Sequence, residues 1–208
     1  PTLAQLAHAA SLPVIAQSGL RVPFASLFAA QRTIVVFVRH FWCPLCQDYM
    51  STLVSAAQPH RMFAPAEDTG RMGTQPVHLV VISNGAHAFI PKYRQLFGLP
   101  YDMYTDPELC LYRALGMARD GLSLTHETGD DHVPLLDGGY VRHSLVGGIA
   151  MVVMRALRTG MPVWEKGGDI DQLGGEFVLG PGLQCSYAHR MQTPKGHAPI
   201  ADVLKAAG

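Results

Sequence analysis

Two short runs of β-branched and apolar residues constrain the fold of this 208-residue chain more than any other feature. They cover Thr33–Val38 (TIVVFV) and Val77–Ile82 (VHLVVI). Runs without polar alternation are typical of strands that are buried on both faces, as in parallel sheets. Between them, residues 44–57 carry apolar side chains at helical spacing, and Pro44 suits the first position of a helix. The sequence therefore predicts a strand–helix–strand unit with a right-handed crossover.

The remaining patterns continue this alternation toward the C-terminus. Gly and Pro divide the chain into short elements, and Asp106 before Pro107 marks a helix start. In chain order we expect a helix at 91–98, a strand at 101–105, a helix at 106–116, a polar inserted loop at 118–140, a helix at 145–158, a hairpin of 176–179 with 183–189 around Gly180-Pro181-Gly182, and a closing helix at 199–207.

These elements predict an α/β fold with a central mixed sheet flanked by helices. Since domains average roughly 150 residues, a chain of this length is expected to bury one core. We therefore expect a single domain over residues 1–208, with an N-terminal extension at 1–30 and an inserted loop and helix at about 118–168.

The charge balance excludes several classes of partner. The chain has 16 Lys and Arg against 16 Asp and Glu, and it contains no basic run. Nucleic acids and anionic membranes both require a concentrated positive field, so neither is expected as a partner. The longest apolar stretch, Leu145–Met154, is interrupted by Gly147 and Gly148 and is far shorter than the roughly 20 residues that span a bilayer.

The cysteines and the N-terminus indicate the compartment. Residues 1–10 show no basic start followed by a long apolar run, so no secretory signal is expected. The four cysteines are too sparse for a disulfide-stapled secreted scaffold. We therefore expect a reducing, cytoplasmic location, and the close pair Cys43 and Cys46 needs another explanation.

The segment Cys43-Pro44-Leu45-Cys46 stands where the first buried strand passes into the helix. Residues three apart on a helix lie about 5 to 6 Å from each other, which is the separation that a disulfide requires. At the cap position, the free N–H groups and the positive end of the helix dipole favour the thiolate of Cys43 and lower its pKa. Cys46, one turn further on and more shielded, suits the resolving role. The pair therefore predicts a redox site.

The two cysteines also have other conceivable uses. Two small buried thiols can lie close by coincidence. Structural zinc needs two more ligands at suitable spacing, and Cys110 and Cys185 are isolated. Covalent haem needs a His after the second Cys, but position 47 is Gln. The remaining histidines form no HxxxH or HExxH arrangement, and there is no GxGxxG or Walker loop, so we expect neither a metal nor a cofactor.

The residues before Cys43 are candidate functional groups. Arg39, or a protonated His40, would stabilise the thiolate of Cys43 and could also orient an anionic or polar substrate. His40 is our candidate catalytic histidine, and Arg39 is a candidate substrate contact. A His40 bonded to the backbone and a solvated Arg39 are the structural alternatives. Trp42 is either a flat wall for a substrate or a core residue, and Pro44 is a further candidate substrate contact.

A resemblance to a known family rests on three stretches. They are VVFVRHFWCPLC, VVISNGAHAFIPKYRQLFGLPYDMYTDPELCLYRALGM, and GGEFVLGPGLQCSYAHR followed by HAPIADVLKAA. In combination they resemble the AhpC/TSA-type peroxiredoxin-like 2 proteins of the thioredoxin superfamily, from about Val22 to Ala207 and least across 118–141. The resemblance implies a thioredoxin-like fold, antioxidant or thiol-redox activity, Cys43 as the attacking cysteine and Cys46 as its partner.

The sequence departs from relatives of that family at two places. Typical peroxiredoxins have a PxxxTxxC motif, whereas here His40 holds the Thr position and no Pro stands at position 36. Thioredoxins place a cis-proline, and many peroxiredoxins an arginine, before the strand that faces the CxxC. This chain has Leu173-Gly174-Gly175 there. Because glycine has no side chain, Gly174 and Gly175 are expected to leave open space above the sulfur for a substrate bulkier than peroxide.

Three functions remain open from the sequence. The first is a thiol oxidoreductase that reduces a peroxide or a disulfide through Cys43 and Cys46 and is restored by an external thiol reductant. The second is a metabolite-processing enzyme that uses the same thiols on a bulky organic substrate, such as an endoperoxide or a thiol conjugate. The third is a non-catalytic thioredoxin-like module. The sequence leaves open whether the chain forms a homodimer.

Overall fold

Strand β3 (Thr33–Phe37) is buried over its whole length, as its apolar run predicted. Alternate residues point to opposite faces of the sheet, so Ile34 and Val36 join one hydrophobic cluster while Val35 and Phe37 join another. The two clusters are the two halves of the core. In this computed structural model the described residues are 1–57, 77–99, 101–119, 139–143, 145–162 and 164–208.

The described secondary structure comprises the following elements. In chain order they are α1 (Leu3–Ser11), β1 (Pro13–Ala16), β2 (Arg21–Pro23), η1 (Phe24–Leu27), β3, α2 (Pro44–Ala57), β4 (His78–Ser83), η3 (His87–Phe89), α4 (Ile90–Phe97), β5 (Asp102–Thr105), α5 (Cys110–Ala114), α6 (Leu145–Thr159), β6 (Gly175–Leu179), β7 (Cys185–Arg190) and α7 (Ile200–Ala207).

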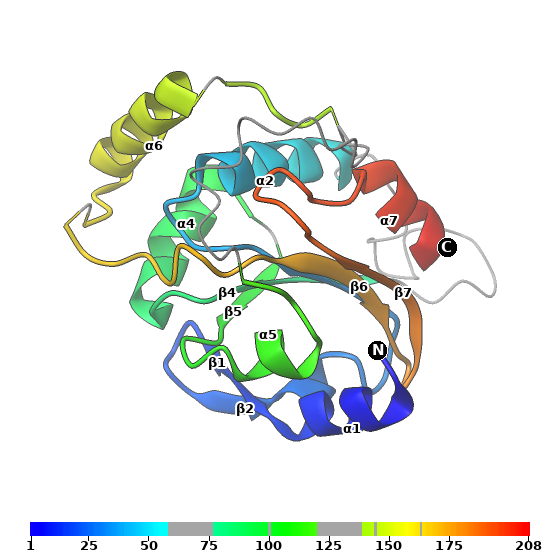
Figure 1. Cartoon of the computed structure of the whole chain (residues 1–208). Helices are drawn as coiled ribbons and strands as arrows, with labels where there is room; N and C mark the ends of the chain where they lie inside the picture. Colours follow the sequence, from blue (N-terminus) through cyan, green and yellow to red (C-terminus); the bar gives the residue numbers. More distant parts are fainter. Residues whose placement is uncertain (58–76, 100, 120–138, 144, 163) are drawn as a thin grey trace, which may run out of the picture.

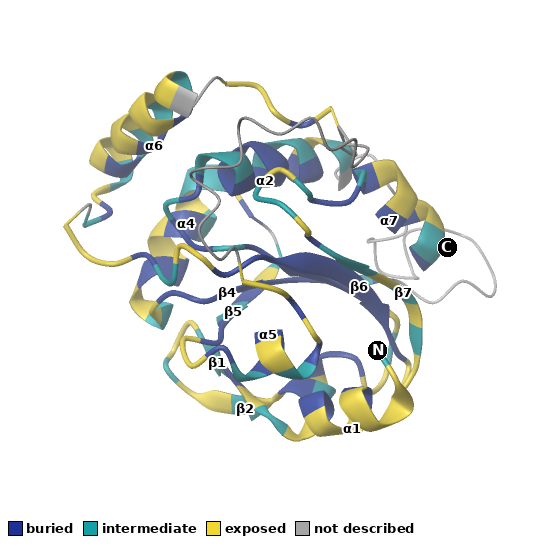
Figure 2. Ribbon diagram, in the orientation of Figure 1, coloured by how far each residue is buried: buried dark blue, intermediate teal, exposed yellow. Residues whose placement is uncertain are grey.

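All seven described strands form one mixed sheet, in the order β2-β1-β5-β4-β3-β6-β7. Strands β3, β4 and β5 are parallel, while β1, β6 and β7 pair antiparallel with their neighbours. Figure 1 shows α2, α4 and α7 on one face of the sheet and α1 and α5 on the other. The buried residues line the space between these layers (Figure 2), and the predicted mixed sheet flanked by helices is confirmed.

The residues that we expected to form an N-terminal extension contribute to the same sheet. Helix α1 begins with a capping box, in which the side chains of Thr2 and Gln5 each accept a hydrogen bond from the other residue's backbone N–H. The β1–β2 hairpin follows, and β1 pairs with β5 through Ile15 and Thr105. Residues 1–30 therefore complete one side of the sheet.

Helix α5 begins later than the sequence predicted. The expected helix over 106–116 starts only at Cys110, because Leu109 adopts a left-handed backbone with φ of 58°. The carboxylate of Asp106 still caps the helix, since it accepts hydrogen bonds from the N–H groups of Cys110 and Leu111 at 3.1 and 2.7 Å. The capping residue was thus identified, but the turn that separates it from the helix was not.

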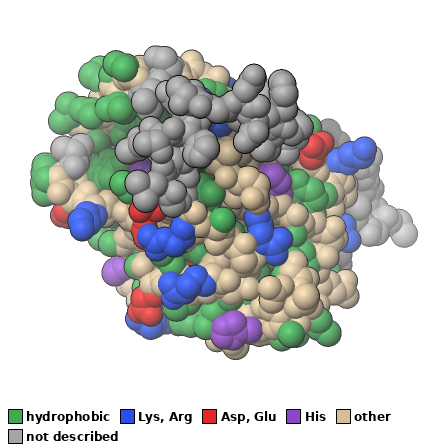
Figure 3. Space-filling view, in the orientation of Figure 1, with side chains coloured by type: hydrophobic (Ala, Val, Ile, Leu, Met, Phe, Trp, Pro, Cys, Tyr) green, Lys and Arg blue, Asp and Glu red, His purple; other side chains and the backbone are tan. Residues whose placement is uncertain are grey.

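The predicted helix of the insertion is observed as α6, which packs against α2 and α4. Most of the predicted loop, residues 120–138, lies outside the described residues. Figure 3 shows hydrophobic side chains gathered on the surface of α6. The exposed ones are Val146, Ile149, Val153, Met154 and Leu157. Among the helices that the structure describes, α6 included, none has both the length and the hydropathy to cross a membrane.

Tyr112 bonds to the ends of the two parallel strands β3 and β4. The chain continues from the end of β3 into the CxxC segment. The buried hydroxyl of Tyr112 donates to the carbonyl oxygen of Val38 at 2.6 Å and lies 3.2 Å from that of Ile82. The ring packs edge-on against Phe37. The hydroxyl therefore satisfies a polar group in a region that water does not reach.

We expect Tyr112→Phe to lower the free energy of unfolding by about 1–3 kcal/mol, because the Val38 carbonyl loses a buried donor. Urea denaturation of the reduced protein measures the change. Tyr104→Phe is the matched control, since Tyr104 is only half-buried, and its cost should be smaller. Equal losses in the two variants would contradict the assigned role of the Tyr112 hydroxyl.

Candidate active site

Cys43 caps the N-terminus of α2. Its sulfur accepts a hydrogen bond from the backbone N–H of Cys46 at 3.3 Å, and its own carbonyl accepts one from Gln47 N–H at 3.0 Å. Pro44 occupies the first helical position and has no N–H to satisfy. The local sequence thus places a sulfur where an oxygen side chain usually caps a helix. The two cysteines are reduced in this structure.

Cys46 lies one turn into α2 and receives contacts from two directions. Its sulfur accepts a hydrogen bond from the backbone N–H of Arg39 at 3.4 Å. The Nε2 atom of His197 lies 3.4 Å from the same sulfur. Both cysteines are shielded from solvent, with Cys43 1% exposed and Cys46 0%. The sulfur of Cys43 is therefore covered by protein atoms in this structure, rather than open to solvent.

The pKa values of the two thiols are shifted in opposite directions. A hydrogen bond from the Cys46 thiol, together with Arg39 and the Cys46 backbone N–H, lowers the pKa of Cys43 to about 6 against the opposing effect of burial. Burial raises the pKa of Cys46 well above its ordinary value, and its hydrogen bond to Cys43 adds to that shift. Near neutral pH the arrangement therefore favours a thiolate at Cys43 and a thiol at Cys46.

Arg39 is held over Cys43 by the chain that leads into β6. Its Nη2 and Nε atoms donate to the carbonyl oxygens of Ile170, at 2.6 Å, and Gln172, at 3.4 Å. Its Nη1 atom lies 3.9 Å from the sulfur of Cys43. The guanidinium thus brings a fixed positive charge close to the sulfur.

His40 does not supply such a charge. Burial, with a smaller contribution from Arg39, lowers the pKa of His40 to about 4, so its ring is neutral at neutral pH. Its Nδ1 atom is buried without a hydrogen-bond partner among the described residues. The expectation that a protonated His40 stabilises the thiolate is therefore wrong, and Arg39 is the cation beside Cys43.

Trp42 and Pro44 contact segments that flank the site. The indole N–H of Trp42 donates to the carbonyl oxygen of Glu165 at 2.9 Å, and its ring packs edge-on against Phe89. Pro44 lies against Gly148 of α6, where an added Cβ atom would come within 2.9 Å of the proline ring. In this structure both side chains hold neighbouring segments in place.

The open space expected at Gly174 and Gly175 is absent. Both residues are buried, and a Cβ atom at Gly174 would collide with the carbonyl oxygen of Phe37. One at Gly175 would collide with the carbonyl oxygen of His189. The glycines are needed because three backbone segments approach closely there, and they leave no room for a bulky substrate.

Two further residues join the site from the C-terminal part of the chain: His197 contacts Cys46, and Glu176 contacts His197. Glu176 of β6 and His197, just before α7, are both 0% exposed, and Glu176 Oε1 lies 2.6 Å from His197 Nδ1. The ring of His197 stacks on Tyr49 of α2 at a centroid distance of 4.2 Å. Neither residue was identified from the sequence. The available signal was Glu176, an acidic residue within an otherwise apolar strand pattern.

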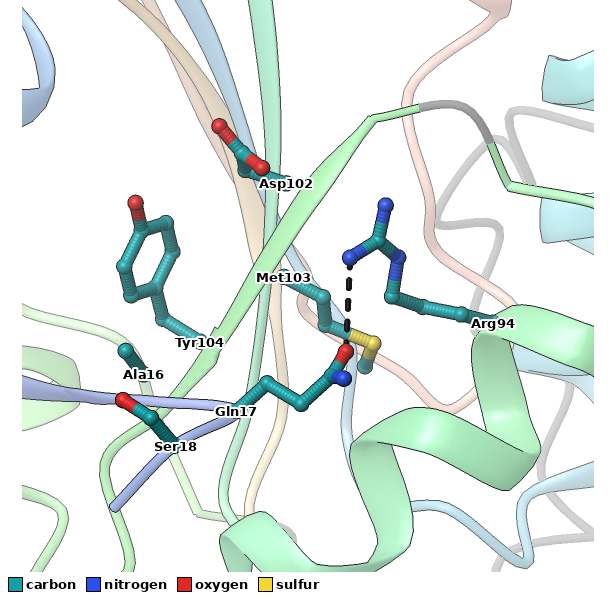
Figure 4. A pocket seen from close by; sticks show the side chains of 7 residues that line it. All are labelled: Ala16, Gln17, Ser18, Arg94, Asp102, Met103 and Tyr104. Atoms are coloured by element: carbon teal, nitrogen blue, oxygen red, sulfur yellow. Dashed lines mark hydrogen bonds between the residues drawn. The ribbon is translucent and has the colours of Figure 1, made fainter. Parts of the chain in front are cut away.

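A pocket lies apart from this thiol site. It has a volume of about 370 Å³ and lies between the end of β1, strand β5 and helix α4 (Figure 4). Arg94 Nη1 donates to Gln17 Oε1 across it at 3.3 Å. None of the described residues that line it belongs to the thiol site. Among the described residues, no group of three or more His, Cys, Asp or Glu side chains could hold a metal ion.

The sheet, its covering helices and the two cysteines at the start of α2 define a thioredoxin-like protein with a dithiol site. The family model described as "AhpC/TSA antioxidant enzyme" matches residues 66–193. The human protein "Peroxiredoxin-like 2C" is 34% identical over 202 residues, covering 97% of this chain and 80% of its own length. The chain therefore belongs to the AhpC/TSA family, as the sequence resemblance indicated. Both cysteines lie outside the residues that the family model matches.

More distant proteins share the fold. Peroxiredoxin Q of Xanthomonas campestris, as a cysteine-to-serine mutant, superimposes with a TM-score of 0.57 at 14% identity, covering 96% of this chain and 92% of that one. The Arabidopsis thaliana protein "Thioredoxin-like protein AAED1, chloroplastic" is 26% identical and covers 94% of this chain and 70% of its own length. The thioredoxin-like fold predicted from the sequence is thus confirmed.

We expect Cys46→Ala to raise the pKa of Cys43 above 6, because the hydrogen bond from the Cys46 thiol is the largest contribution that lowers it. Ultraviolet absorbance of the thiolate, followed against pH in the reduced protein, gives the midpoint. Cys185→Ala is the control and should leave that midpoint unchanged, since Cys185 lies on β7 and does not contact Cys43 in the described structure. An unaltered midpoint in Cys46→Ala would contradict this account.

Proposed function

We propose that this chain is a thiol peroxidase that reduces a small hydroperoxide through Cys43 and Cys46 and is restored by an external thiol. The observation that carries the proposal is the lowered pKa of Cys43, about 6, at a helix N-terminus with Cys46 hydrogen-bonded to it. Membership of the AhpC/TSA family supports the same reaction class.

The chemistry would run in three steps. The Cys43 thiolate attacks one oxygen of the O–O bond, that bond breaks, and the departing alkoxide or hydroxide takes a proton and leaves as an alcohol or water. Cys43 is then a sulfenic acid. Cys46 attacks its sulfur to give the disulfide and water, and an external thiol reopens the bridge by thiol–disulfide exchange.

The covering of Cys43 bears on the choice of substrate. Because the residue is 1% exposed, a substrate reaches the sulfur only after a local movement of the groups above it. A small hydroperoxide requires a smaller opening than a protein disulfide or a bulky conjugate. The close packing at Gly174 and Gly175 also removes the feature that favoured a bulky organic substrate.

A non-catalytic thioredoxin-like module is the second candidate. It would carry a Cys43 thiol with an ordinary pKa, and the lowered pKa argues against it. The burial of both cysteines is the observation in its favour, since the cysteines would then serve only the core. Oxidation of Cys43 by peroxide separates the two candidates.

Intact mass after one equivalent of hydrogen peroxide tests the proposed function. We expect the wild type to lose two hydrogens, reversibly with dithiothreitol, and Cys46→Ser to gain one oxygen at Cys43. Cys43→Ser should show neither change at that dose. Cys110→Ser, which alters a cysteine outside the site, should match the wild type. A wild type that remains unmodified, or a Cys43→Ser variant with full activity, would refute the proposal.

The rate of the first oxidation should depend on pH through the thiolate of Cys43. Because the pKa of Cys43 is lowered to about 6, the thiolate fraction increases as the pH rises through that value and levels off above it. The observed rate constant should therefore reach a plateau near neutral pH. Measuring it in Cys46→Ser isolates the first step, and the serine hydroxyl can still donate a hydrogen bond to the sulfur of Cys43. A rate that rises only near pH 9 in the wild type would indicate an ordinary thiol.

A further inference from the structure

Two buried side chains, His197 and Glu176, continue a chain of contacts that begins at Cys46 of the thiol pair. The sulfur of Cys46 is 3.4 Å from Nε2 of His197, and Nδ1 of the same ring is 2.6 Å from Oε1 of Glu176. All three residues are 0% exposed. They come from α2, the segment before α7, and β6, and His197 and Cys46 are 151 residues apart in the sequence. Tertiary folding alone therefore brings them together.

The hydrogen bonds around Glu176 fix the direction of this chain of contacts. Its Oε2 atom accepts the backbone N–H of Ala198 at 3.1 Å, and its Oε1 atom faces Nδ1 of His197. An ionised carboxylate only accepts hydrogen bonds, so Nδ1 is the nitrogen that carries the proton in a neutral ring. The Nε2 lone pair then faces the sulfur of Cys46. Once Cys43 has been oxidised to the sulfenic acid, the Cys46 thiol no longer has the Cys43 thiolate as acceptor and can donate to Nε2 instead.

The position of the ring is held from its sides as well. Tyr49 stacks on His197 with an interplanar angle of 11°, and Tyr140 packs against it edge-on. The Tyr140 hydroxyl also accepts the backbone N–H of His197 at 3.4 Å. The imidazole is therefore fixed in orientation, which a group that accepts a proton from one defined atom requires.

We propose that His197 is the general base that removes the thiol proton of Cys46 when Cys46 closes the disulfide with Cys43, and that Glu176 positions the ring and stabilises its protonated form. This inference rests on the proposed function, because it concerns the second step of that reaction. His197 contacts a reacting atom and is a catalytic residue, whereas Glu176 acts through His197 and is a positioning residue.

Closure of the disulfide conserves atoms and electrons. Nε2 of His197 takes the proton of the Cys46 thiol, and the electron pair left on that sulfur forms the bond to the sulfur of Cys43. The S–O bond of the sulfenic acid breaks, and the departing hydroxide takes one proton to leave as water. One thiol and one sulfenic acid thus give one disulfide and one water, and the imidazole returns to its neutral form.

The environment of Cys46 explains why a base is needed there. Burial raises the pKa of this thiol, so only a small fraction is thiolate near neutral pH. A thiol is a far weaker nucleophile than a thiolate. Without a neighbouring acceptor for its proton, the resolving sulfur would react slowly, and Nε2 of His197 is the acceptor in contact with it.

We call the contacts from Cys46 through His197 to Glu176 the relay. Time-resolved intact mass tests its role in the variants Glu176→Gln and His197→Gln. The reduced proteins are mixed with one equivalent of hydrogen peroxide, quenched with acid at intervals, and analysed for the added oxygen and for the loss of two hydrogens. We expect the oxygen to appear at about the wild-type rate and the disulfide to close about 10²-fold more slowly, the usual contribution of general base catalysis. The closing rate of the variants should also rise more steeply with pH than that of the wild type, because without the base only the thiolate of Cys46 reacts.

His78→Gln is the matched control. It removes a histidine that pairs with a carboxylate elsewhere, since His78 Nε2 lies 3.5 Å from Asp102 Oδ2, and neither residue contacts the thiols in the described structure. Its closing rate should equal that of the wild type. If circular dichroism shows that the two relay variants do not fold, the rate of disulfide closure in the wild type is compared between water and deuterium oxide. Slower closure in deuterium oxide supports proton transfer in this step, and an unchanged rate overturns it.

The outcomes separate the relay from the proposed function. A wild type that neither gains oxygen nor loses hydrogens refutes the proposed function and the relay with it. A wild type that closes its disulfide, with both folded variants closing at the same rate and with the same pH profile, overturns the relay and leaves the proposed function intact.

Discussion

The burial of Glu176 is the constraint on which the arrangement of the thiol site depends. Its carboxylate is 0% exposed, and an isolated charge in such surroundings would cost several kcal/mol. The cost is offset only because His197 and the N–H of Ala198 both bond to it. The segment that carries these partners must therefore return over the sheet before α7 begins, and in doing so it covers Cys46. The contacts that join the buried acid, the histidine and the thiol thus follow from one packing requirement.

The same arrangement gives two cysteine side chains of identical chemistry different pKa values. Cys43 stands at the end of a helix, where N–H groups and Arg39 favour a negative sulfur, whereas Cys46 stands one turn deeper and faces an imidazole. The separation of one helical turn is enough to move the two pKa values in opposite directions. The attacking and resolving roles that we propose for the two thiols would therefore follow from their different positions at the start of α2.

Local sequence predicted those features that depend on neighbouring residues. The run at Thr33–Phe37, the helix that starts at Pro44 and the cap at Cys43 follow from residue patterns of a few positions, and the structure has them within about one residue. The β1–β2 hairpin was missed because its strands are only four and three residues long and Val14 is their one buried residue, so they are too short to show an alternating pattern. The prediction of open space at Gly174 failed because the sequence cannot show that another backbone fills it. His197 was missed for the same kind of reason, since its partners come from distant elements.

Because Cys43 is 1% exposed, its sulfur can react with an oxidant only after neighbouring groups move. The side chains next to Cys43 in the sequence are held by contacts that are individually modest: Arg39 donates to two backbone carbonyls, and Trp42 donates to a third. Each such hydrogen bond contributes only about 0.5 to 3 kcal/mol net, so releasing the Arg39 side chain is far less costly than unfolding a strand. Arg39 is also the charge that favours the thiolate, so a movement of its side chain away from Cys43 would weaken that effect.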